Sequence, residues 1–362
     1  MRVLIVSHTY TAPYNRAKLD ALAERVTLTA IAPEQWQDTL FALDAEARTN
    51  AAYSLHPLPI RFNGRVLRHF YSLRSLSRIL AETQPDVVYV EEEPASLALA
   101  QFAWLKRNYK LICFTWENIL QHAGFPSVER YNLARCDGVM AGNTDAAQII
   151  HAKGFRKPIQ VTPQLGVDVP DIQSIPANEL RASLGLKHFV VGYFGRLVEE
   201  KGLLTLLDAV RELNDSQLLI IGAGALQSEL AKRSAEKVRV IPAVPHVQVA
   251  HYMRALDAFV LPSQTTPRWK EQFGHVLIEA MACGVPVIGS NSGAIPEVIG
   301  NAGLIFPERD ANALRNAIAE LQSNPARREQ LAQAGRARVL ANFTHDHIAD
   351  ANVEFFNQVM AS

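Results

Sequence analysis

Residues 258–297 read AFVLPSQTTPRWKEQFGHVLIEAMACGVPVIGSNSGAIPE, and this stretch decides the fold. An apolar run at 258–261 is followed by a polar loop, an Ala-rich helical stretch, a second apolar run at 285–288 and a small-residue loop. Strand, loop, helix, strand and loop in this order predict a βαβα unit of a parallel sheet. The loops of such a unit lie at the edge where open α/β sheets bind ligands.

Two carboxylates in this stretch mark a candidate site. Glu271 lies in the polar loop, and Glu279 follows eight positions later within the predicted helix. The turn at Phe273 and Gly274 begins this helix, and the first N–H groups of a helix attract anions. Carboxylates accept hydrogen bonds from hydroxyl groups. The pattern therefore fits a ligand that is both polyol and phosphate, such as a nucleotide sugar; the alternative is an incidental Glu pair on a surface helix.

Bulk composition limits the function classes. The chain has 362 residues, which suits two domains better than one core. Lys+Arg and Asp+Glu are equal at 36 each, which argues against general nucleic-acid binding. Cys113, Cys136 and Cys283 have no metal-ligand or redox spacing, so we expect buried thiols in a reducing cytoplasm. The apolar run at 3–6 predicts a first strand rather than a signal peptide, and no run approaches the roughly 18 residues of a membrane span.

Strand-like runs alternate with helical stretches through both halves of the chain. In the first half, strands are predicted at 3–6, 26–31, 87–90, 111–114, 138–141 and 159–161, and helices near 16–24, 66–82, 96–106 and 145–153. In the second half, strands are predicted at 190–194, 218–221, 238–241, 258–261, 285–288 and 304–306. Their nearly continuous Val and Ile content is typical of parallel sheets covered by helices on both faces.

These elements predict an α/β fold of two Rossmann-like αβα domains whose parallel sheets face each other across a cleft. The N-terminal domain is predicted at 1–165 and the C-terminal domain at 189–342, with a Pro- and Gly-punctuated linker at 166–188. A final helix within 343–362 is a candidate to pack back on the N-terminal domain.

Glycines and basic residues follow two strands of the second half. Arg196 and Lys201, in the loop after residue 194, lie between Gly195 and Gly202 and could neutralise a diphosphate, although a solvent-exposed turn is the alternative. The turn at 222–224 lacks the third Gly of the dinucleotide-binding fingerprint, so a dehydrogenase is disfavoured.

Together these motifs resemble those of the retaining glycosyltransferases of family 4, which have the GT-B fold. The resemblance rests on motifs that occur in the family's order and spacing over residues 192–300: Phe194-Gly195-Arg196, Glu200-Lys201-Gly202, Ile221-Gly222-Ala223-Gly224, residues 258–263 and the Glu271/Glu279 pair. It implies transfer of a sugar from a UDP- or GDP-linked donor, with retention of anomeric configuration, to a glycan or lipid-linked acceptor in cell-surface polysaccharide or glycolipid synthesis. It also implies no metal or other cofactor, and a departing phosphate oxygen that takes the acceptor's proton. The alternatives are a GT-B nucleotide-sugar epimerase, a phosphorylase, for whose pyridoxal-bearing Lys no motif is visible, or a catalytically silent sugar-nucleotide-binding subunit.

The resemblance also assigns roles to residues. Arg196 and Lys201 would hold the donor diphosphate and stabilise it as the leaving group, and Glu271 would grip the donor sugar. Glu279 would accept hydrogen bonds from the ribose hydroxyls. The other donor-side residues would be Gly195, Val244, His246, Phe273, Gly274, His275 and Val276.

The first domain would bind the acceptor, and its candidate residues follow strand ends. Many relatives carry a Gly-Gly pair after the first strand, whereas residues 7–16 contain no Gly. His8 lies in this loop, but the sequence gives no further support for a role. The three acids at 91–93 follow a strand end, where they could meet a cationic or hydroxyl-rich ligand. The alternative is that they are acids at a helix N-terminus, where the helix dipole favours negative charge. The acceptor-side candidates are Asn15, Arg16, Glu91, Glu117, Asn118 and His122.

Residues 47–81 contain no acidic residue but six arginines, with aromatic residues among them. One interpretation is a solvated helix face beside a loop. The other is a peripheral contact, from Arg61 to Arg78, with an anionic membrane surface. The expected location is therefore the cytoplasm, with contact at the cytoplasmic face of the membrane under the second interpretation.

Overall fold

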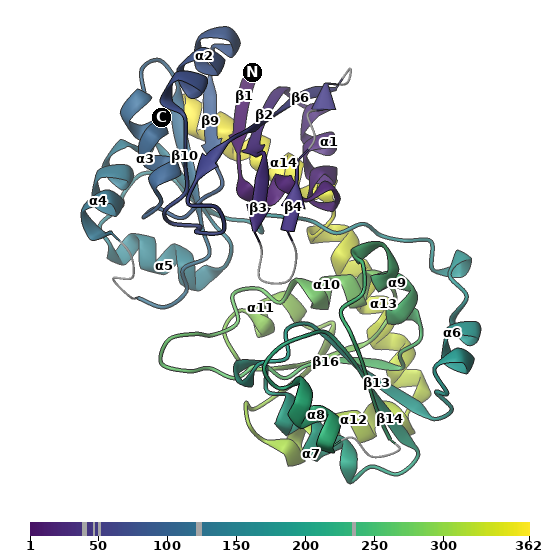
Figure 1. The fold of residues 1–362 in the computed structure, drawn as a ribbon. Helices are drawn as coiled ribbons and strands as arrows, with labels where there is room; N and C mark the ends of the chain where they lie inside the picture. Colours follow the sequence, from purple (N-terminus) through teal and green to yellow (C-terminus); the bar gives the residue numbers. More distant parts are fainter. Residues whose placement is uncertain (38–41, 46–47, 50–51, 121–124, 234–236) are drawn as a thin grey trace. The chain divides into compact units, whose positions relative to one another are not determined.

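The computed structural model describes residues 1–37, 42–45, 48–49, 52–120, 125–233 and 237–362. The chain divides into two compact units (Figure 1). Unit 1 consists of Met1–Gly166 together with His345–Ser362, and unit 2 consists of Val167–Thr344. Each unit is built on one large parallel sheet with helices around it, which confirms the predicted pair of Rossmann-like α/β domains.

The sheet of unit 1 has the strand order β12-β11-β10-β9-β1-β2-β6-β5. All of its described pairings are parallel except that of β5 with β6. The chain passes from β1 through β2 to β6 on one side and then returns to β9 on the other side of β1. The strand order therefore reverses between β1 and β9, and such a switch point is where open sheets bind ligands. The strands are β1 (Arg2–Val6), β2 (Thr27–Pro33), β5 (Arg48–Thr49), β6 (Tyr53–Leu58), β9 (Val87–Val90), β10 (Lys110–Thr115), β11 (Gly138–Ala141) and β12 (Ile159–Val161).

Alternate residues of β1 belong to two cores, one on each face of the sheet. Val3 and Ile5 pack in the core that contains residues of α1 and α14, and Leu4 packs in the core that contains residues of α2 and α3. The helices of unit 1 are α1 (Ala17–Ala23), α2 (Leu73–Thr83), α3 (Leu97–Leu105), α4 (Pro126–Arg135), α5 (Thr144–Ala152) and α14 (His345–Ala361), with the 3-10 turns η1 (His8–Thr11) and η2 (Pro13–Arg16).

The last helix, α14, packs beside α1 in unit 1, as the yellow and purple ribbons show in Figure 1. Its Phe355, Phe356 and Val359 are fully buried in the core on that face of the sheet. Arg25 adds ion pairs to Asp346 at 3.1 Å and to Asp350 at 2.5 Å.

One predicted helix is shorter than its sequence pattern indicated. The helix predicted at 66–82 begins only at Leu73, because Ser72 accepts a hydrogen bond from the N–H of Ser75 as its N-cap. The residues before it form β8 (Phe70–Tyr71), which pairs antiparallel with β7 (Ile60–Arg61). The hairpin of β3 (Gln35–Gln37) and β4 (Ala42–Asp44) and the largely polar helix α4 were not predicted, because none of them has a long apolar period.

The sheet of unit 2 is parallel, with the order β15-β14-β13-β16-β17-β18, so its switch point lies between β13 and β16. Its strands are β13 (Phe189–Phe194), β14 (Ser216–Ile221), β15 (Val238–Ile241), β16 (Ala258–Leu261), β17 (Val287–Ser290) and β18 (Gly303–Phe306). Its helices include α7 (Leu203–Arg211), α8 (Gln227–Arg233), α9 (His246–Arg254), α10 (His275–Ala282), α11 (Ile295–Ile299), α12 (Ala311–Ser323) and α13 (Pro325–Asn342), with the 3-10 turn η4 (Glu199–Lys201).

The segment predicted as a linker, 166–188, contains helical structure. All but its first residue belong to unit 2, and they include η3 (Ile172–Ser174) and α6 (Ala177–Ser183). Arg181 fixes α6 by donating to Asp257 at 3.0 Å and to the carbonyl of His188 at 2.7 Å. The proline-rich composition did not reveal α6, which the partly exposed Arg181 ties to the rest of unit 2.

The structure also bears on the cysteines, on membrane-spanning helices and on the arginine-rich segment. Cys113, Cys136 and Cys283 are free and buried. Among the described residues, no helix has both the length and the apolar character to cross a membrane. The arginines from Arg61 to Arg78 are exposed, as is Phe62 at 59 %, whereas His69 and Tyr71 are buried.

Candidate active site

The loops that follow β13 and β16 meet at the switch point of unit 2. Lys201, in η4 after β13, places Nζ 2.6 Å from Oε2 of Glu271, in the loop after β16. Ser263 donates its hydroxyl to the same oxygen at 2.6 Å. The ring of Trp269 lies 4.8 Å from Lys201 Nζ. Residues 70 positions apart are thus joined into one charged cluster at the edge where parallel sheets bind ligands.

Two glycines allow these loops to approach so closely. Gly202 has φ 66°, and a Cβ there would collide with the carbonyl oxygen of Pro262. Gly293, after β17, has φ 51°, and a Cβ there would collide with the carbonyl oxygen of Glu271. Both positions need the left-handed backbone and the missing side chain of glycine. The backbone on both sides of the Lys201–Glu271 pair is therefore fixed by tight contacts.

Arg196 stands next to this cluster in sequence but is more exposed. Its side chain is 44 % exposed, and its guanidinium lies 3.8 Å from Glu200. Its carbonyl accepts a hydrogen bond from Tyr193 at 2.7 Å, which fixes the backbone after Gly195. The guanidinium is thus held on a fixed backbone with much of its charge open to a ligand.

Glu279 lies in α10 and faces two histidines. Its Oε1 lies 3.2 Å from His246 Nε2, at the start of α9, and 3.4 Å from His275 Nδ1. Burial raises the pKa of Glu279, but the hydrogen bonds from His246 and His275 outweigh it and hold the pKa at about 2. The carboxylate is therefore ionised at neutral pH and can accept hydrogen bonds from ligand hydroxyls. The structure places His246, two residues after Val244, beside Glu279, and all three are candidate donor-side residues.

The N-terminus of α10 lies between the two carboxylates in sequence. Gly274 is its N-cap, with φ 79°, and it supplies no capping side chain. Phe273 packs on Phe343, with ring centroids 5.8 Å apart, while His275 and Val276 form the first turn. A helix end with this geometry favours an anionic group of a ligand.

In unit 1, the side chains of Asn15 and Arg16 donate hydrogen bonds within the loop that contains them. Asn15 donates to the carbonyl of Thr9 at 2.9 Å, and Arg16 donates to the carbonyls of Tyr10 and Thr11 at 2.9 and 3.1 Å. These bonds fix the loop after β1 without any Gly-Gly pair. No sequence pattern indicated that the carbonyls of this loop would be the partners.

Glu91 belongs to a buried network rather than to an open surface. It forms an ion pair with Lys18, which is fully buried, and it accepts a hydrogen bond from Tyr10 at 2.6 Å. Lys18 also donates to the carbonyl of Gln164 at 2.8 Å. Burial lowers the pKa of Lys18. Sequence reasoning missed Lys18, whose only signal was a Lys at an otherwise apolar position of the first helix.

The neighbouring Glu92 also contacts the loop after β1. His8 places Nδ1 2.8 and 2.9 Å from the two oxygens of Glu92 and donates its backbone N–H to Oε1 at 2.9 Å. His69 Nε2 lies 3.6 Å from Oε1, and the ring of Trp36 lies 4.5 Å from the ring of His8. The sequence associated His69 only with the arginine-rich segment and did not point to Trp36.

Glu93 and the loop after β10 are also linked. Glu93 accepts hydrogen bonds from the Thr115 hydroxyl at 2.6 Å and the Trp116 N–H at 2.8 Å. Burial nevertheless raises its pKa to about 7. Asn118 is buried farther along this loop. His122 lies outside the described residues.

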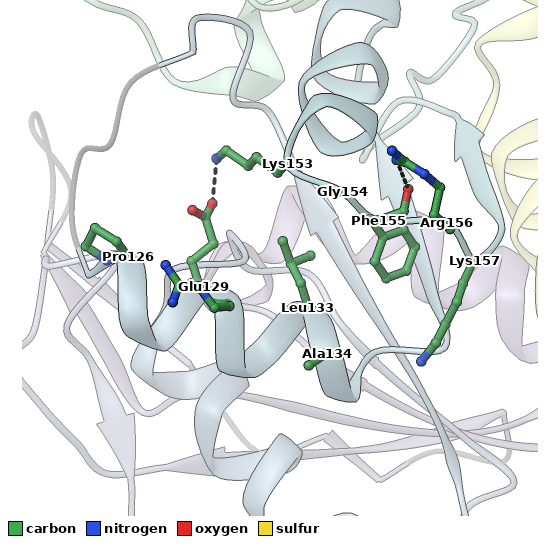
Figure 2. A pocket seen from close by; sticks show the side chains of 10 residues that line it. Pro126, Glu129, Leu133, Ala134, Lys153, Gly154, Phe155, Arg156 and Lys157 are labelled. Carbon is green, nitrogen blue, oxygen red and sulfur yellow. Dashed lines mark hydrogen bonds and ion pairs between the residues drawn. The ribbon is translucent and has the colours of Figure 1, made fainter.

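A cavity of about 480 Å³ lies between α4 and the turn from α5 to β12 (Figure 2). Leu133 and Phe155 supply apolar lining, and Lys153 and Glu129 form an ion pair of 2.5 Å at one side (Figure 2). Lys153 also pairs with Glu117. The structure therefore ties the acceptor-side candidate Glu117 to a lysine of this cavity.

No group of three or more His, Cys, Asp or Glu side chains is placed to hold a metal ion within the ranges that the structure describes.

Two family models match the chain, one in each half. The model described as glycosyl transferases group 1 matches residues 177–338, and the model described as glycosyl transferase 4-like domain matches residues 11–164. A GDP-mannose-dependent monoacylated alpha-(1-6)-phosphatidylinositol monomannoside mannosyltransferase from Corynebacterium glutamicum is 33% identical over 165 residues, which cover 43% of this chain and 43% of the relative. The chain spans about half the length of the curated relatives that it matches.

Solved structures match over the whole chain. Sucrose-phosphate synthase from Thermosynechococcus elongatus has a TM-score of 0.75 at 20% identity and covers 100% of this chain and 99% of its own. HepE from Anabaena in complex with UDP has a TM-score of 0.71 at 19% identity and covers 99% of this chain and 100% of its own. These matches confirm the expected fold class.

Proposed function

The chain belongs to the glycosyl transferases group 1, with a glycosyl transferase 4-like domain in its first half, and we propose that it transfers a hexosyl unit from a nucleoside-diphosphate sugar to a glycan or lipid-linked acceptor. One observation carries the proposal: Lys201 and Glu271 lie 2.6 Å apart at the switch point of unit 2. Lys201 supplies a cation for the phosphates of such a donor, and Glu271 supplies a carboxylate for its hydroxyl groups. Both lie at the edge of the sheet where ligands bind.

The donor site of the proposal lies in unit 2. Arg196 and Lys201 offset the charge of the diphosphate, and the N-terminus of α10 adds its dipole. Glu271, held by Ser263, accepts hydrogen bonds from the transferred sugar, and the ionised Glu279 accepts them from the ribose. His246 and His275 keep Glu279 ionised. Because His246 lies in α9 and His275 in α10, both helices contribute residues to the proposed donor site.

The chemistry of the proposal is transfer with retention of anomeric configuration and without a metal cofactor. As the bond to the anomeric carbon breaks, negative charge grows on the departing diphosphate. Arg196 and Lys201 stabilise this charge, which is the role that Mg²⁺ has in metal-dependent transferases.

The acceptor is proposed to bind unit 1 and to belong to cell-surface polysaccharide or glycolipid synthesis. A relative in Corynebacterium glutamicum is named for the use of GDP-mannose and a phosphatidylinositol mannoside, which supports a lipid-linked acceptor. The exposed arginines from Arg61 to Arg78 would then meet anionic lipid headgroups at the cytoplasmic face of a membrane.

A thermal-shift panel with UDP, GDP, ADP, CMP and NAD tests the donor site directly. We expect one nucleoside diphosphate to stabilise the chain, since a ligand that binds only the folded state raises its stability by mass action. The HepE structures contain UDP and UDP-glucose, and the Corynebacterium relative is named for GDP-mannose, so UDP and GDP are the first two to test.

The nucleotide that responds selects the donor for an activity assay with UDP-glucose or GDP-mannose. Transfer of the labelled sugar to an alkyl glycoside, with the anomeric configuration of the product read by NMR, would support the proposal. Stabilisation by NAD alone, or an inverted product, would overturn the donor class or the stereochemistry respectively.

A further inference from the structure

Trp269 lies beside the proposed donor site, which assigns it no role. Its ring centroid lies 4.8 Å from Nζ of Lys201. The same ammonium lies 2.6 Å from Oε2 of Glu271. An ammonium within about 6 Å of an indole ring centroid is attracted by the negative charge of the ring face. In the part of the chain that the structure describes, the Lys201 ammonium is therefore held by two groups, one carboxylate and one aromatic ring.

The two groups hold Lys201 in different ways. Glu271 carries a full negative charge, which offsets the positive charge that the diphosphate of a donor needs. The indole ring is neutral, so it attracts the ammonium and leaves the net charge of Lys201 intact. In the proposed donor site, Glu271 also accepts hydrogen bonds from the transferred sugar, so the sugar and Lys201 compete for one carboxylate. The ring of Trp269 takes no part in this competition and still holds Lys201 when the sugar occupies Glu271.

A closed turn fixes the backbone of Trp269. The N–H of Thr266 donates to the carbonyl of Trp269 at 2.8 Å, and the N–H of Trp269 donates to the carbonyl of Thr266 at 3.4 Å. The hydroxyl of Thr266 donates to the same carbonyl of Trp269 at 3.3 Å. Trp269 itself is half-buried. The ring is thus carried on a short, hydrogen-bonded turn.

The loop after β18 anchors this turn through Thr265. Glu308 accepts hydrogen bonds from the N–H of Thr265 and from its hydroxyl, the latter at 2.6 Å. Arg309 donates to the carbonyl of Thr265 at 2.7 Å. Arg309 has φ 64°, a backbone conformation that is unfavourable for a residue with a Cβ. All three polar groups of Thr265 are therefore bound, and one of the residues that bind them is held in a strained conformation, as happens where the surrounding fold fixes a segment.

Gln264 joins the same loop to the backbone that carries Lys201. Its N–H donates to the carbonyl of Glu200, the residue before Lys201, at 2.8 Å. Its side chain donates to the hydroxyl of Thr205, in α7, at 2.7 Å. The ring of Trp269 and the ammonium of Lys201 therefore belong to two segments that are hydrogen-bonded to each other.

We propose that Trp269 is a positioning residue of the donor site, whose ring holds the Lys201 ammonium toward the diphosphate while Glu271 binds the transferred sugar. The inference rests on the proposed glycosyl transfer and adds a residue that acts through Lys201. Lys201 and Glu271, which are paired in the structure, can then bind different parts of one donor at the same time. The ring makes this possible because it holds the ammonium in place of the carboxylate without cancelling its charge.

The kinetic test compares Trp269→Leu, Trp269→Phe and the control Trp104→Leu, with UDP-glucose or GDP-mannose as donor and an octyl glycoside as acceptor. Trp269→Leu keeps an apolar side chain but removes the ring, and it should lower kcat by about 3- to 30-fold, the factor that corresponds to a cation–π contact. The Kd for the nucleoside diphosphate should stay within about two-fold of the wild type, since Lys201 acts mainly on charge that develops during transfer. Trp269→Phe keeps a ring and should recover most of the lost kcat. Trp104, in α3 of unit 1, is 64 % exposed, so Trp104→Leu should behave like the wild type.

A double-mutant cycle shows whether the ring acts through Lys201. Lys201→Ala removes the ammonium, so adding Trp269→Leu to it should leave kcat within about two-fold of that of Lys201→Ala alone. A double variant that loses the full factor of Trp269→Leu again would overturn the proposal, because the ring would then act on another group. Equal kcat values in Trp269→Leu and Trp269→Phe would also overturn it, since the ring face would then contribute nothing.

The wild type separates failure of this role from failure of the proposed transfer. If the wild type transfers sugar and Trp269→Leu keeps the wild-type kcat, only the positioning role of Trp269 fails. A Kd for the nucleoside diphosphate that rises by more than kcat falls would contradict action on the developing charge. If the wild type releases no nucleoside diphosphate from either donor, the proposed transfer fails, and the role of Trp269 with it.

Discussion

At the scale of single residues, both units use the same device. A carboxylate after one switch-point strand meets a basic side chain after the other: Glu271 meets Lys201 in unit 2, and Glu92 meets His8 in unit 1. In each pair the basic residue is the more exposed partner. The carboxylate therefore fixes the orientation of the more exposed basic side chain, and substitutions at the two partners should have different effects.

Glu279→Gln should weaken nucleoside diphosphate binding. The change removes the charge that accepts hydrogen bonds from the ribose, and such bonds contribute about 1.5–3 kcal/mol, or roughly 10- to 100-fold in Kd. Isothermal titration calorimetry with the stabilising nucleotide measures this. Glu320→Gln, at an exposed glutamate of α12, is the matched control. Equal affinities in the two variants would contradict the ribose assignment.

Lys201→Ala should slow transfer more than it weakens nucleotide binding. Lys201 is proposed to stabilise charge that develops as the diphosphate leaves, and loss of such a group costs about 10²- to 10³-fold in kcat. Steady-state kinetics beside calorimetry separates the two effects, with Lys187→Ala as the control at an exposed lysine of the same unit. A variant with unchanged kcat would remove Lys201 from the catalytic group.

Glu93 should make the stability of unit 1 depend on pH. Burial raises its pKa from 4.5 to about 7, so the folded chain holds the proton more tightly than the unfolded chain. The contribution of this group to stability is therefore full below pH 4.5 and is lost as pH rises to about 7. Glu93→Gln should raise the melting temperature relative to the wild type more at pH 8 than at pH 5. A pH-independent difference would show that Glu93 titrates normally.

At the scale of elements, strands were the most predictable part of the fold. Five predicted strands, 87–90, 138–141, 159–161, 238–241 and 258–261, have the bounds found in the structure, because buried parallel strands are short apolar runs with clear ends. The helix predicted at 66–82 failed over its first residues, because the pattern did not reveal the Ser72 cap and the β7–β8 hairpin.

The candidate site was only partly predictable for a related reason. Glu271 and Glu279 lie in one stretch of sequence, so their loop and helix could be read from it directly. His8 and Glu92 are 84 residues apart and meet only because β1 lies beside β9. Strand order is set by packing of whole helices against the sheet, and no local pattern encodes it. The same limit hid the ion pair of Lys18 with Glu91.

Gly293→Ala tests whether the loop after β17 holds the site together. A Cβ at Gly293 would collide with the carbonyl of Glu271, so the Glu271 loop must shift, and transfer should fall by about ten-fold or more. Gly284→Ala is a matched control, since its φ of 69° is also positive but the nearest atom to its Cβ is 3.6 Å away. It should cost about 1 kcal/mol of stability and leave transfer unchanged. Equal kinetics in both variants would contradict the role of the contact.

At the scale of the whole molecule, the chain is not divided into two consecutive halves. Unit 2 is continuous, whereas unit 1 is made of two separate segments. The donor site of the proposal lies entirely within unit 2, and α14 contributes its buried side chains to unit 1. Destabilising substitutions in α14 should therefore lower the stability of unit 1 and weaken acceptor binding, but they should leave donor binding unchanged.

Phe355→Ala should destabilise unit 1 by about 3–5 kcal/mol, as expected when a fully buried aromatic side chain is truncated. Nucleotide affinity should stay at the wild-type value under conditions where the chain is folded. Differential scanning calorimetry and titration of the nucleotide measure the two quantities. Met360→Ala, on the same helix but 43 % exposed, is the control. A matching loss of nucleotide affinity would mean that α14 supports the donor site as well.

The insertion of unit 2 between the two segments of unit 1 sets an order of assembly during translation. Residues 167–344 leave the ribosome before α14, so unit 2 can close while the sheet of the first segment still lacks Phe355, Phe356 and Val359. At about 5–20 residues per second, that apolar face stays bare for on the order of ten seconds. The nascent first segment is therefore the part of this chain that a chaperone would hold, and the last helix is what releases it.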